Sequence, residues 1–198
     1  MAKVGRFEKR AMLSTSHQRE GVRRARTVLE HLDLEGKRDY LELGCEGGHV
    51  TRLMATECGL HCTGTDVDPE MVEVARSRSG GVANVRFLTA DATALPFGDG
   101  AFDVALSFGI LHHIARWPRV IGEVSRVLRP GGNYVLGDFA YSRLGKALLR
   151  PLVRNYGVYT ADDLLERTAG AGLRTVWRAS PRGSFFRYHA LVLERAGD

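Results

Sequence analysis

The chain has 198 residues, 44% of them hydrophobic, and its 28 basic and 23 acidic side chains give a formal net charge of +5. This length suits one well-packed domain and is short for two. No apolar run approaches the roughly 20 residues of a membrane span, and the polar N-terminus lacks the apolar stretch of a secretory signal. An odd cysteine count of 3 favours free thiols and a cytoplasmic location.

The charge is unevenly distributed along the chain. Residues 1–26 carry eight basic side chains against two acidic ones, whereas residues 39–110 carry eleven acids against four arginines. A basic surplus returns at Arg143, Lys146, Arg150 and Arg154. Two interpretations stay open for the basic segments: an arginine-rich solvated surface, or a surface for RNA, anionic lipid or an acidic small molecule.

Hydrophobic periodicity and breaker residues predict alternating helices and strands. In chain order, strands are expected at 40–43, 60–65, 85–88, 101–107 and 134–139, and helices at 16–32, 48–58, 70–78 and 119–128. Asp68 and Pro69 are a favourable N-cap and first-turn pair. Residues 129–132, Arg-Pro-Gly-Gly, predict a sharp turn before the fifth strand.

The last part of the chain changes character. Residues 160–163 predict the start of a helix that ends near Gly170 or Gly172. Two alternating segments, 173–179 and 185–194, then predict a β-hairpin across residues 180–184.

These elements predict an α/β, Rossmann-like doubly wound sheet of seven strands. It is mostly parallel, with an antiparallel C-terminal hairpin strand and helices on both faces. Right-handed crossovers place a ligand at the carboxyl ends of the first, second and fourth strands. We expect one domain over 1–198, with 1–35 as a basic arm and lid, 39–139 as a cofactor-binding core, and 140–198 as the C-terminal helix and hairpin.

A strand, a glycine-rich turn, a helix and an acid at the tip of the next strand are typical of a nucleoside site. Here the turn is Gly44 to Gly48 and the acid is Asp66. A dinucleotide fingerprint would need three glycines, but its second and third positions hold Glu46 and His49. The Glu46 carboxylate would repel a diphosphate. S-adenosylmethionine, which has no phosphate and carries positive charge, fits better.

Several motifs stand in order along residues 39–139. They are Glu42-Leu43-Gly44-Cys45-Glu46-Gly47-Gly48, residues 64–71 around Asp66, residues 90–97 beginning Ala-Asp-Ala, Phe102–Ser107, Leu111-His112-His113-Ile114, and residues 126–132 ending in Pro-Gly-Gly. Together they resemble the class I S-adenosylmethionine-dependent methyltransferases, and in spacing the subfamily that includes ubiquinone and menaquinone biosynthesis enzymes. The resemblance implies a methyltransferase with S-adenosylmethionine as cofactor.

The resemblance also implies cofactor-binding roles. Gly44 and Gly48 would let the backbone approach the methionine portion, with Glu42 near the ammonium and Thr51 at the turn or the methionine carboxylate. Asp66 would accept from the ribose hydroxyls and Val67 would pack on adenine. The remaining predicted contacts are small Cys45 in the turn, Glu46 toward the positive charge, Asp91 and Ala92 at the adenine amine, and Ser107 near the sulfonium.

Glu46 departs from the motif, which has glycine at this position. If the turn requires a positive φ there, a side chain carries strain of about 1 kcal/mol or more, unless Gly47 absorbs it by shifting the turn. Two orientations stay open: a carboxylate that faces the cofactor's positive charge and offsets the strain, or one that points to solvent.

His112 and His113 follow the fourth strand, where the methyl acceptor is expected. A histidine can take a proton near neutral pH, and we assign His112 as the candidate catalytic base. A structural role, in a loop or under the cofactor, is the alternative. The following aromatic residues could wall an acceptor pocket or pack in the core: Trp117, Phe139, Tyr141, Tyr156 and Tyr159.

The sequence thus predicts a methyltransferase that acts on O, N or C of a small-molecule acceptor, without a metal site. RNA methylation through the basic flanks is an alternative, although no Asn-Pro-Pro-Tyr-type motif follows the fourth strand. A non-catalytic S-adenosylmethionine-binding regulator is a second alternative, and a dehydrogenase the least favoured. The core motifs indicate the cofactor better than the acceptor.

Overall fold

The computed structural model describes residue 9 and residues 11–150, 152–179 and 186–197. Its strands are β1 (Asp39–Leu43), β2 (His61–Asp66), β3 (Val85–Thr89), β4 (Phe102–Phe108), β5 (Leu128–Tyr141), β6 (Leu173–Ala179) and β7 (Phe186–Arg195). Its helices are α2 (Thr15–Leu29), α3 (His49–Glu57), α4 (Pro69–Arg78), α5 (Trp117–Val127), α6 (Arg143–Leu149) and α7 (Ala161–Gly170), with a 3-10 turn η1 (Leu111–His113).

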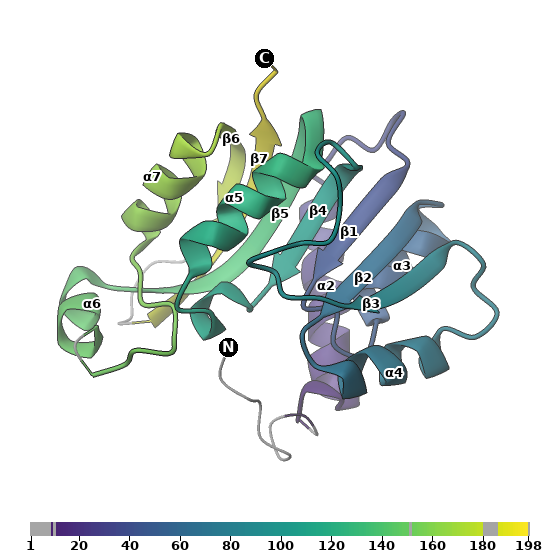
Figure 1. The fold of residues 1–198 in the computed structure, drawn as a ribbon, viewed down its shortest axis with the longest axis horizontal. Coiled ribbons are helices and arrows are strands. Elements are labelled where there is room, and N and C mark those ends of the chain that lie inside the picture. Colours follow the sequence, from purple (N-terminus) through teal and green to yellow (C-terminus); the bar gives the residue numbers. More distant parts are fainter. Residues whose placement is uncertain (1–8, 10, 151, 180–185, 198) are drawn as a thin grey trace.

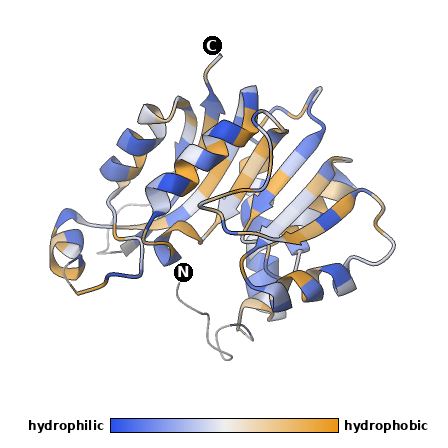
Figure 2. Cartoon of the chain, in the orientation of Figure 1, coloured by the Kyte–Doolittle hydropathy of each residue, from blue (hydrophilic) through white to orange (hydrophobic). Residues whose placement is uncertain are grey.

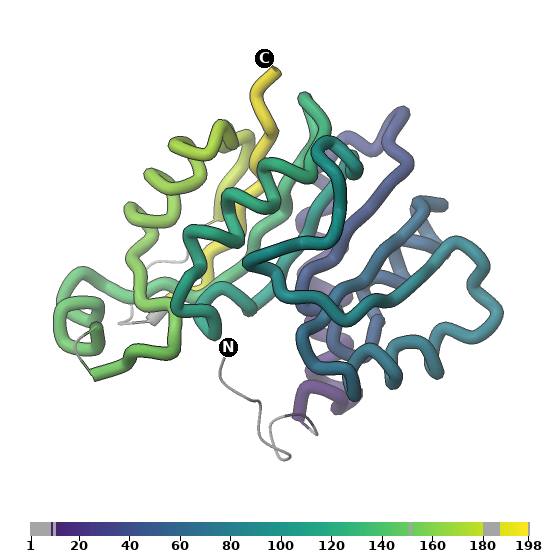
Figure 3. The backbone as a smooth tube through the Cα atoms, in the orientation of Figure 1, coloured from purple at the N-terminus to yellow at the C-terminus, as the bar shows by residue number. Residues whose placement is uncertain are grey.

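The strands form one seven-stranded sheet in the order β3-β2-β1-β4-β5-β7-β6. The pairs from β3 to β5 are parallel, and β7 runs antiparallel to both β5 and β6. The chain moves outward from β1 through β2 to β3 and then crosses back to β4 (Figure 3). Ligands of such sheets bind where the connections diverge, here between β1 and β4. The predicted fold class is confirmed.

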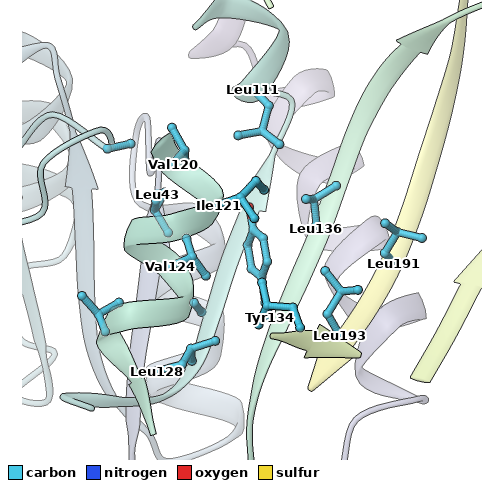
Figure 4. Packing of buried hydrophobic residues seen from close by; sticks show 14 of the residues in the cluster. Leu43, Leu111, Val120, Ile121, Val124, Leu128, Tyr134, Leu136, Leu191 and Leu193 are labelled. Atoms are coloured by element: carbon cyan, nitrogen blue, oxygen red, sulfur yellow. The ribbon is translucent and has the colours of Figure 1, made fainter. Parts of the chain in front are cut away.

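Helices cover both faces of the sheet. In Figure 1, α5 and α7 lie in front of the strands while α2 and α3 lie behind them. The front layer is held by apolar residues at helical spacing along α5, namely Val120, Ile121, Val124 and Val127, all fully buried. Figure 4 shows this cluster, in which Tyr134 and Leu136 of β5 pack toward α5.

The rear layer uses the alternate strand residues. Tyr40 of β1 and Val104 and Leu106 of β4 face a second cluster with Val28 of α2 and Met54 of α3. Successive strand residues point to opposite faces, so an uninterrupted apolar strand serves both layers. Such strands are typical of a parallel sheet covered by helices on both sides.

Local signals in the sequence set several helix ends as predicted. Asp68 accepts a hydrogen bond from the Glu70 N–H at 3.0 Å, and Pro69 opens α4. Thr160 and Asp163 form a reciprocal capping box at the start of α7.

Some elements differ from prediction. The expected turn at residues 129–132 lies inside β5, as a bulge: Phe102 pairs with Leu128 and Val104 with Asn133. The short elements α6 and η1 were not predicted, since a single turn or two of helix has little periodicity to detect. The predicted hairpin connection at 180–184 lies outside the described residues. Within the described ranges, no helix has the length and apolar character needed to cross a membrane.

Candidate active site

A cavity of about 570 Å³ lies at the carboxyl ends of the central strands. Its walls come from the turn after β1, the end of β2, the start of α4, and the loops after β3 and β4. The lining residues are Lys9, Met12, Gly44, Glu46, Thr65, Asp66, Val67, Asp68, Pro69, Glu70, Met71, Ala90, Ala92, Gly109, Ile110, His113 and Ile114. The position matches the predicted one, and the volume is ordinary for a cofactor site.

The glycine turn brings bare backbone to the cavity wall. Gly44 has φ +72°, and a Cβ at this position would lie 2.3 Å from Cγ2 of Ile110. The N–H groups of Gly44 and Cys45 both donate to the Thr65 carbonyl, at 2.7 and 2.9 Å, which ties the turn to β2. No residue with a side chain fits at Gly44 without moving Ile110.

Glu46 adopts the strained conformation itself. Its φ is +47°, the one positive φ at a non-glycine residue in the described chain. The side chain lines the cavity, and its Oε1 lies 3.2 Å from Nε2 of His17 in α2. This hydrogen bond raises the pKa of His17. The positive φ of the turn therefore falls on Glu46 and is not shifted to Gly47. Glu46 lies between the cavity and α2.

Asp66 ends β2 with its carboxylate held in place by backbone donors. Oδ2 accepts from the Glu46 N–H at 3.1 Å, and Oδ1 accepts from the Asp68 N–H at 2.9 Å. Burial raises the pKa of this carboxyl. The backbone N–H of Glu46 thus helps to orient Asp66, the residue predicted to accept from the ribose hydroxyls. Val67, the next residue, also lies on the cavity wall.

Glu42 lies behind the wall. The side chain is buried and accepts a hydrogen bond from the Thr51 hydroxyl. Two residues predicted to bind the cofactor are therefore bonded to each other. Burial raises the pKa of Glu42 to about 8. Neither residue lines the cavity.

Four further predicted residues also lie off the cavity wall. Gly48, with φ +75°, is the N-cap of α3, where a Cβ would strike the Phe87 ring at 2.8 Å. Cys45 is buried beside Val72 and Ala75 of α4. The reasons for these positions are packing and backbone geometry, which a motif match does not separate from ligand contact.

Ser107 and Asp91 complete this group. The Ser107 hydroxyl is fully buried and lies 2.6 Å from the Tyr134 hydroxyl, between β4 and β5. Asp91 is exposed, and its Oδ1 accepts from the Thr93 N–H and hydroxyl, both at 2.8 Å. Ala92, the neighbour of Asp91, is on the wall as predicted.

The histidines after β4 lie in η1 beside β5. His112 Nδ1 is 2.6 Å from Oδ1 of Asp138, a buried residue whose Oδ2 accepts from the Leu111 N–H at 2.6 Å. His113, not His112, lines the cavity, and the centroids of the two rings are 4.1 Å apart. His112, the predicted base, is thus next to a residue of the cavity wall but does not line the cavity itself.

Sequence reasoning missed Asp138, Ile110 and Lys9 as parts of the site. An acid at the end of an otherwise apolar fifth strand was a detectable signal for Asp138, because such strand ends meet at the ligand edge. Lys9 had no signal: it lies in the N-terminal segment and reaches the cavity only through its ion pairs with Asp68 at 2.5 Å and Glu70 at 2.6 Å.

The aromatic residues that could have formed an acceptor wall are divided in role. Tyr159 is buried and packs against Trp117 with ring centroids 4.7 Å apart, which makes these two part of the core. The rings of Phe139 and His112 pack edge to face with centroids 5.6 Å apart, and the ring centroids of Tyr156 and His113 are 6.0 Å apart.

Electrostatics and shape favour a cationic nucleoside in the cavity. Four acids line it, Glu46, Asp66, Asp68 and Glu70, against one lysine that is already paired with two of them. Diphosphate binding is disfavoured by this charge, whereas a sulfonium and an ammonium are attracted. Apolar groups from Val67, Ile110 and Ile114 supply surfaces for a flat base.

Residues 41–136 match the Methyltransf_11 family model, a methyltransferase domain. This segment is a methyltransferase domain. The family assigned from the sequence is confirmed, and so is S-adenosylmethionine as the cofactor of the domain. The residues on the cavity wall fit that group in charge and in shape, for the reasons just given.

Two curated relatives illustrate the likeness. The domain is 41% identical over 103 residues to 27-O-demethylrifamycin SV methyltransferase of Amycolatopsis mediterranei, covering 50% of this chain and 38% of that protein. It is 39% identical over 119 residues to demethylmenaquinone methyltransferase of Thermus thermophilus, covering 59% and 53%. The chain therefore spans about half or less of the length of these relatives.

A solved structure shows the same fold. The geranyl diphosphate C-methyltransferase of Streptomyces coelicolor, in complex with Mg2+, geranyl diphosphate and S-adenosyl-L-homocysteine, has a TM-score of 0.73 at 14% identity. The superposition covers 93% of this chain and 84% of that one, so it extends well beyond residues 41–136.

Proposed function

We propose that the chain transfers a methyl group from S-adenosylmethionine to an O, N or C atom of a small-molecule acceptor. The observation that carries the proposal is the acid-lined cavity at the switch between β1 and β4 of a methyltransferase domain, with Asp66 oriented by two backbone donors. When bound, the cofactor supplies an activated methyl group. The chain's contribution is alignment and exclusion of water.

The cofactor contacts in this proposal are assigned by position. Gly44, Asp66, Val67 and Ala92 lie on the wall and contact the cofactor directly. Glu42, Thr51, Gly48, Cys45, Asp91 and Ser107 support the turn and strand ends from behind. Glu46 lies on the cavity wall while its Oε1 contacts His17, and this position on the wall supports the first of the two orientations considered for it.

The acceptor side lies at η1. His113, Ile110 and Ile114 form the wall there, and we assign proton removal to the His112–Asp138 pair next to it. Asp138 holds the ring of His112 through Nδ1 and stabilises the imidazolium that forms when the ring takes a proton. An acceptor without an acidic proton needs no such step.

The N-terminal segment serves as a lid in this proposal. Lys9 and Met12 line the cavity, and His17 contacts Glu46, which supports the division of one domain into arm, cofactor core and C-terminal part. Residues 1–8 and 10 of the arm lie outside the described residues. The cysteines Cys45, Cys58 and Cys62 are free thiols, consistent with the proposed cytoplasmic location.

The test separates cofactor binding from turnover. Calorimetric titration with S-adenosylmethionine, S-adenosylhomocysteine and NAD should give binding of the two adenosyl ligands without NAD. Asp66→Ala should weaken it, whereas Asp33→Ala, on a loop away from the cavity, should not. An acceptor screen led by phenols and quinones, read by S-adenosylhomocysteine formation, should then give product.

The outcomes distinguish the alternatives. Binding without product from any acceptor would favour a non-catalytic regulator, and product only from RNA, with binding that falls steeply with salt, would favour RNA methylation. Absence of adenosyl binding would contradict the proposal as a whole.

A further inference from the structure

Four exposed apolar side chains follow β5 within a short stretch of the chain. They are spaced by four residues, and each is exposed: Leu144 by 66%, Leu148 by 56%, Leu152 by 79% and Tyr156 by 42%. We call these four residues the leucine stripe. The first two lie on one face of α6, as a spacing of four requires, and the others lie in the segment that follows the helix.

The stripe is not an unfinished part of the core. The opposite face of α6 makes the inward contacts, with Gly145 buried and Lys146 held by Asp163 at 2.6 Å. In Figure 1, α6 stands at the edge of the molecule beside α7, and Figure 2 shows hydrophobic and hydrophilic residues side by side on its turns. Only one other large hydrophobic residue in the described chain is comparably exposed, Val176 on β6. The concentration of the other four within residues 144–156 distinguishes the stripe from surface leucines scattered along the chain.

Arginines border the stripe. Arg143, Arg150 and Arg154 are all exposed and interleave with the leucines. Arg143 reaches Asp162 at 2.9 Å in a pair that water surrounds. Within the described residues, no salt bridge joins Arg150 or Arg154 to an acid. Two of the three arginines thus have no ion pair among the described residues. Exposed leucines beside such arginines are the composition of a segment that lies on an anionic bilayer.

We propose that the leucine stripe and its three arginines bind the surface of a membrane rich in anionic lipid. The leucines enter the boundary between headgroups and acyl chains, and the arginines stay at the headgroups. A second copy of the chain is a poorer occupant, because a symmetric contact through this face would set arginines against arginines. RNA would satisfy the arginines but leave the leucines without an apolar partner.

The position of the stripe links it to the cavity. The ring of Tyr156, the last residue of the stripe, lies 6.0 Å from that of His113 on the cavity wall. The next residue, Gly157, donates its N–H to the His112 carbonyl at 2.9 Å. A bilayer bound at the stripe would therefore lie on the η1 side of the site. The proposal of a membrane surface does not depend on which reaction, if any, the site performs.

Vesicle flotation tests the proposal with the full chain. Phosphatidylcholine vesicles with and without phosphatidylglycerol are the probe, and the partition coefficient is the readout. Wild type should float with the anionic vesicles, and less so as salt rises. Leu148→Ser with Leu152→Ser should lower partitioning by about tenfold or more. Arg150→Gln and Arg154→Gln should each lower it about fivefold, on anionic vesicles only.

A matched control and a folding control make the result specific. Val176→Ser with Arg178→Gln removes an exposed apolar residue and an exposed arginine from β6 and should leave partitioning unchanged. Calorimetric binding of S-adenosylhomocysteine by the stripe variants should match wild type, which separates loss of the surface from loss of the fold or of the cofactor site.

Three results would overturn the proposal. One is wild type that fails to float with anionic vesicles. Another is flotation that the leucine variants retain in full. The third is a wild-type dimer, seen by light scattering, that the leucine variants dissociate while vesicle binding is absent from both; this would assign the stripe to self-association.

Discussion

The Oε1 atom of Glu46 lies 3.2 Å from Nε2 of His17, so the residue that replaces a motif glycine connects the cofactor turn to the N-terminal helix. Both side chains are partly exposed, at 27% and 51%, so solvent screens the pair and its contribution to stability is small. Since the folded-state pKa of His17 is raised, this contribution is complete at low pH and is lost as pH rises through that pKa.

The strain at Glu46 is testable by comparing two substitutions. Glu46→Ala keeps the positive φ and removes the side-chain contacts, whereas Glu46→Gly removes both the contacts and the strain. Urea unfolding should show the glycine variant to be more stable than the alanine variant by about 1 kcal/mol. Equal stabilities would mean that the turn relaxes around a side chain.

The Glu46 carboxylate should also attract the positive cofactor. Glu46→Gln keeps the size of the side chain and removes its charge, so calorimetry should show S-adenosylmethionine bound about fivefold more weakly. The loss should be smaller for S-adenosylhomocysteine, which lacks the sulfonium charge. Severalfold tighter binding by Glu46→Gly or Glu46→Gln would contradict the compensating role proposed for this residue.

Glu42 should make stability depend on pH. In the folded state burial raises its pKa from 4.5 to about 8, so the unfolded chain loses this proton at a lower pH than the folded chain does. Wild type therefore loses stability as pH rises from about 4.5 to 8. Glu42→Gln can still accept a hydrogen bond from Thr51. Its free energy of unfolding should rise relative to that of wild type by a few kcal/mol as pH increases over this window.

Urea unfolding of the ligand-free protein at both ends of the window measures this difference. A gap between wild type and Glu42→Gln that is the same at pH 5 and pH 8 would show that Glu42 does not titrate between these values.

The His112–Asp138 pair should act on turnover and not on cofactor affinity. For an acceptor with an acidic proton, His112→Ala should lower kcat by about 100-fold or more, with S-adenosylhomocysteine affinity unchanged. Asp138→Asn should lower kcat as well and alter the pH profile of kcat/KM, because the ring loses its carboxylate partner.

His113→Ala is the matched control, since His113 lines the cavity beside His112. It should change KM for the acceptor more than kcat. If Asp138→Asn lowered Tm but left kcat and its pH profile intact, Asp138 would be structural only.

Ser107 and Tyr134 should be coupled in stability. Each hydroxyl is the other's partner in a fully buried site, at 2.6 Å, so Tyr134→Phe or Ser107→Ala alone leaves one hydroxyl unsatisfied at a cost of about 1–3 kcal/mol. The double variant should lose about 1 kcal/mol less than the two single losses combined. Additive losses, measured by urea unfolding, would show that the hydroxyls act independently.

Much of the fold was predictable because its signals are local. The cap at Asp68, the capping box at Thr160 and the apolar strand around Leu41 act through neighbours a few residues away or through period alone. The order of motifs then placed Gly44, Asp66 and Ala92 on one cavity, because carboxyl ends of parallel strands share an edge. The short helix α6 had no such signal: seven residues with Gly145 inside form a helix only against the body of the protein.

The sequence by itself determined the fold class, the cofactor and the edge of the sheet that binds it, since these follow from patterns and spacing. Only the tertiary structure decided which motif residues face the cavity: Ser107 bonds to Tyr134, Glu42 to Thr51, and His112 to Asp138, 26 residues away. Partners distant in the chain and side-chain directions at strand ends depend on packing of the whole sheet, and no local pattern encodes them.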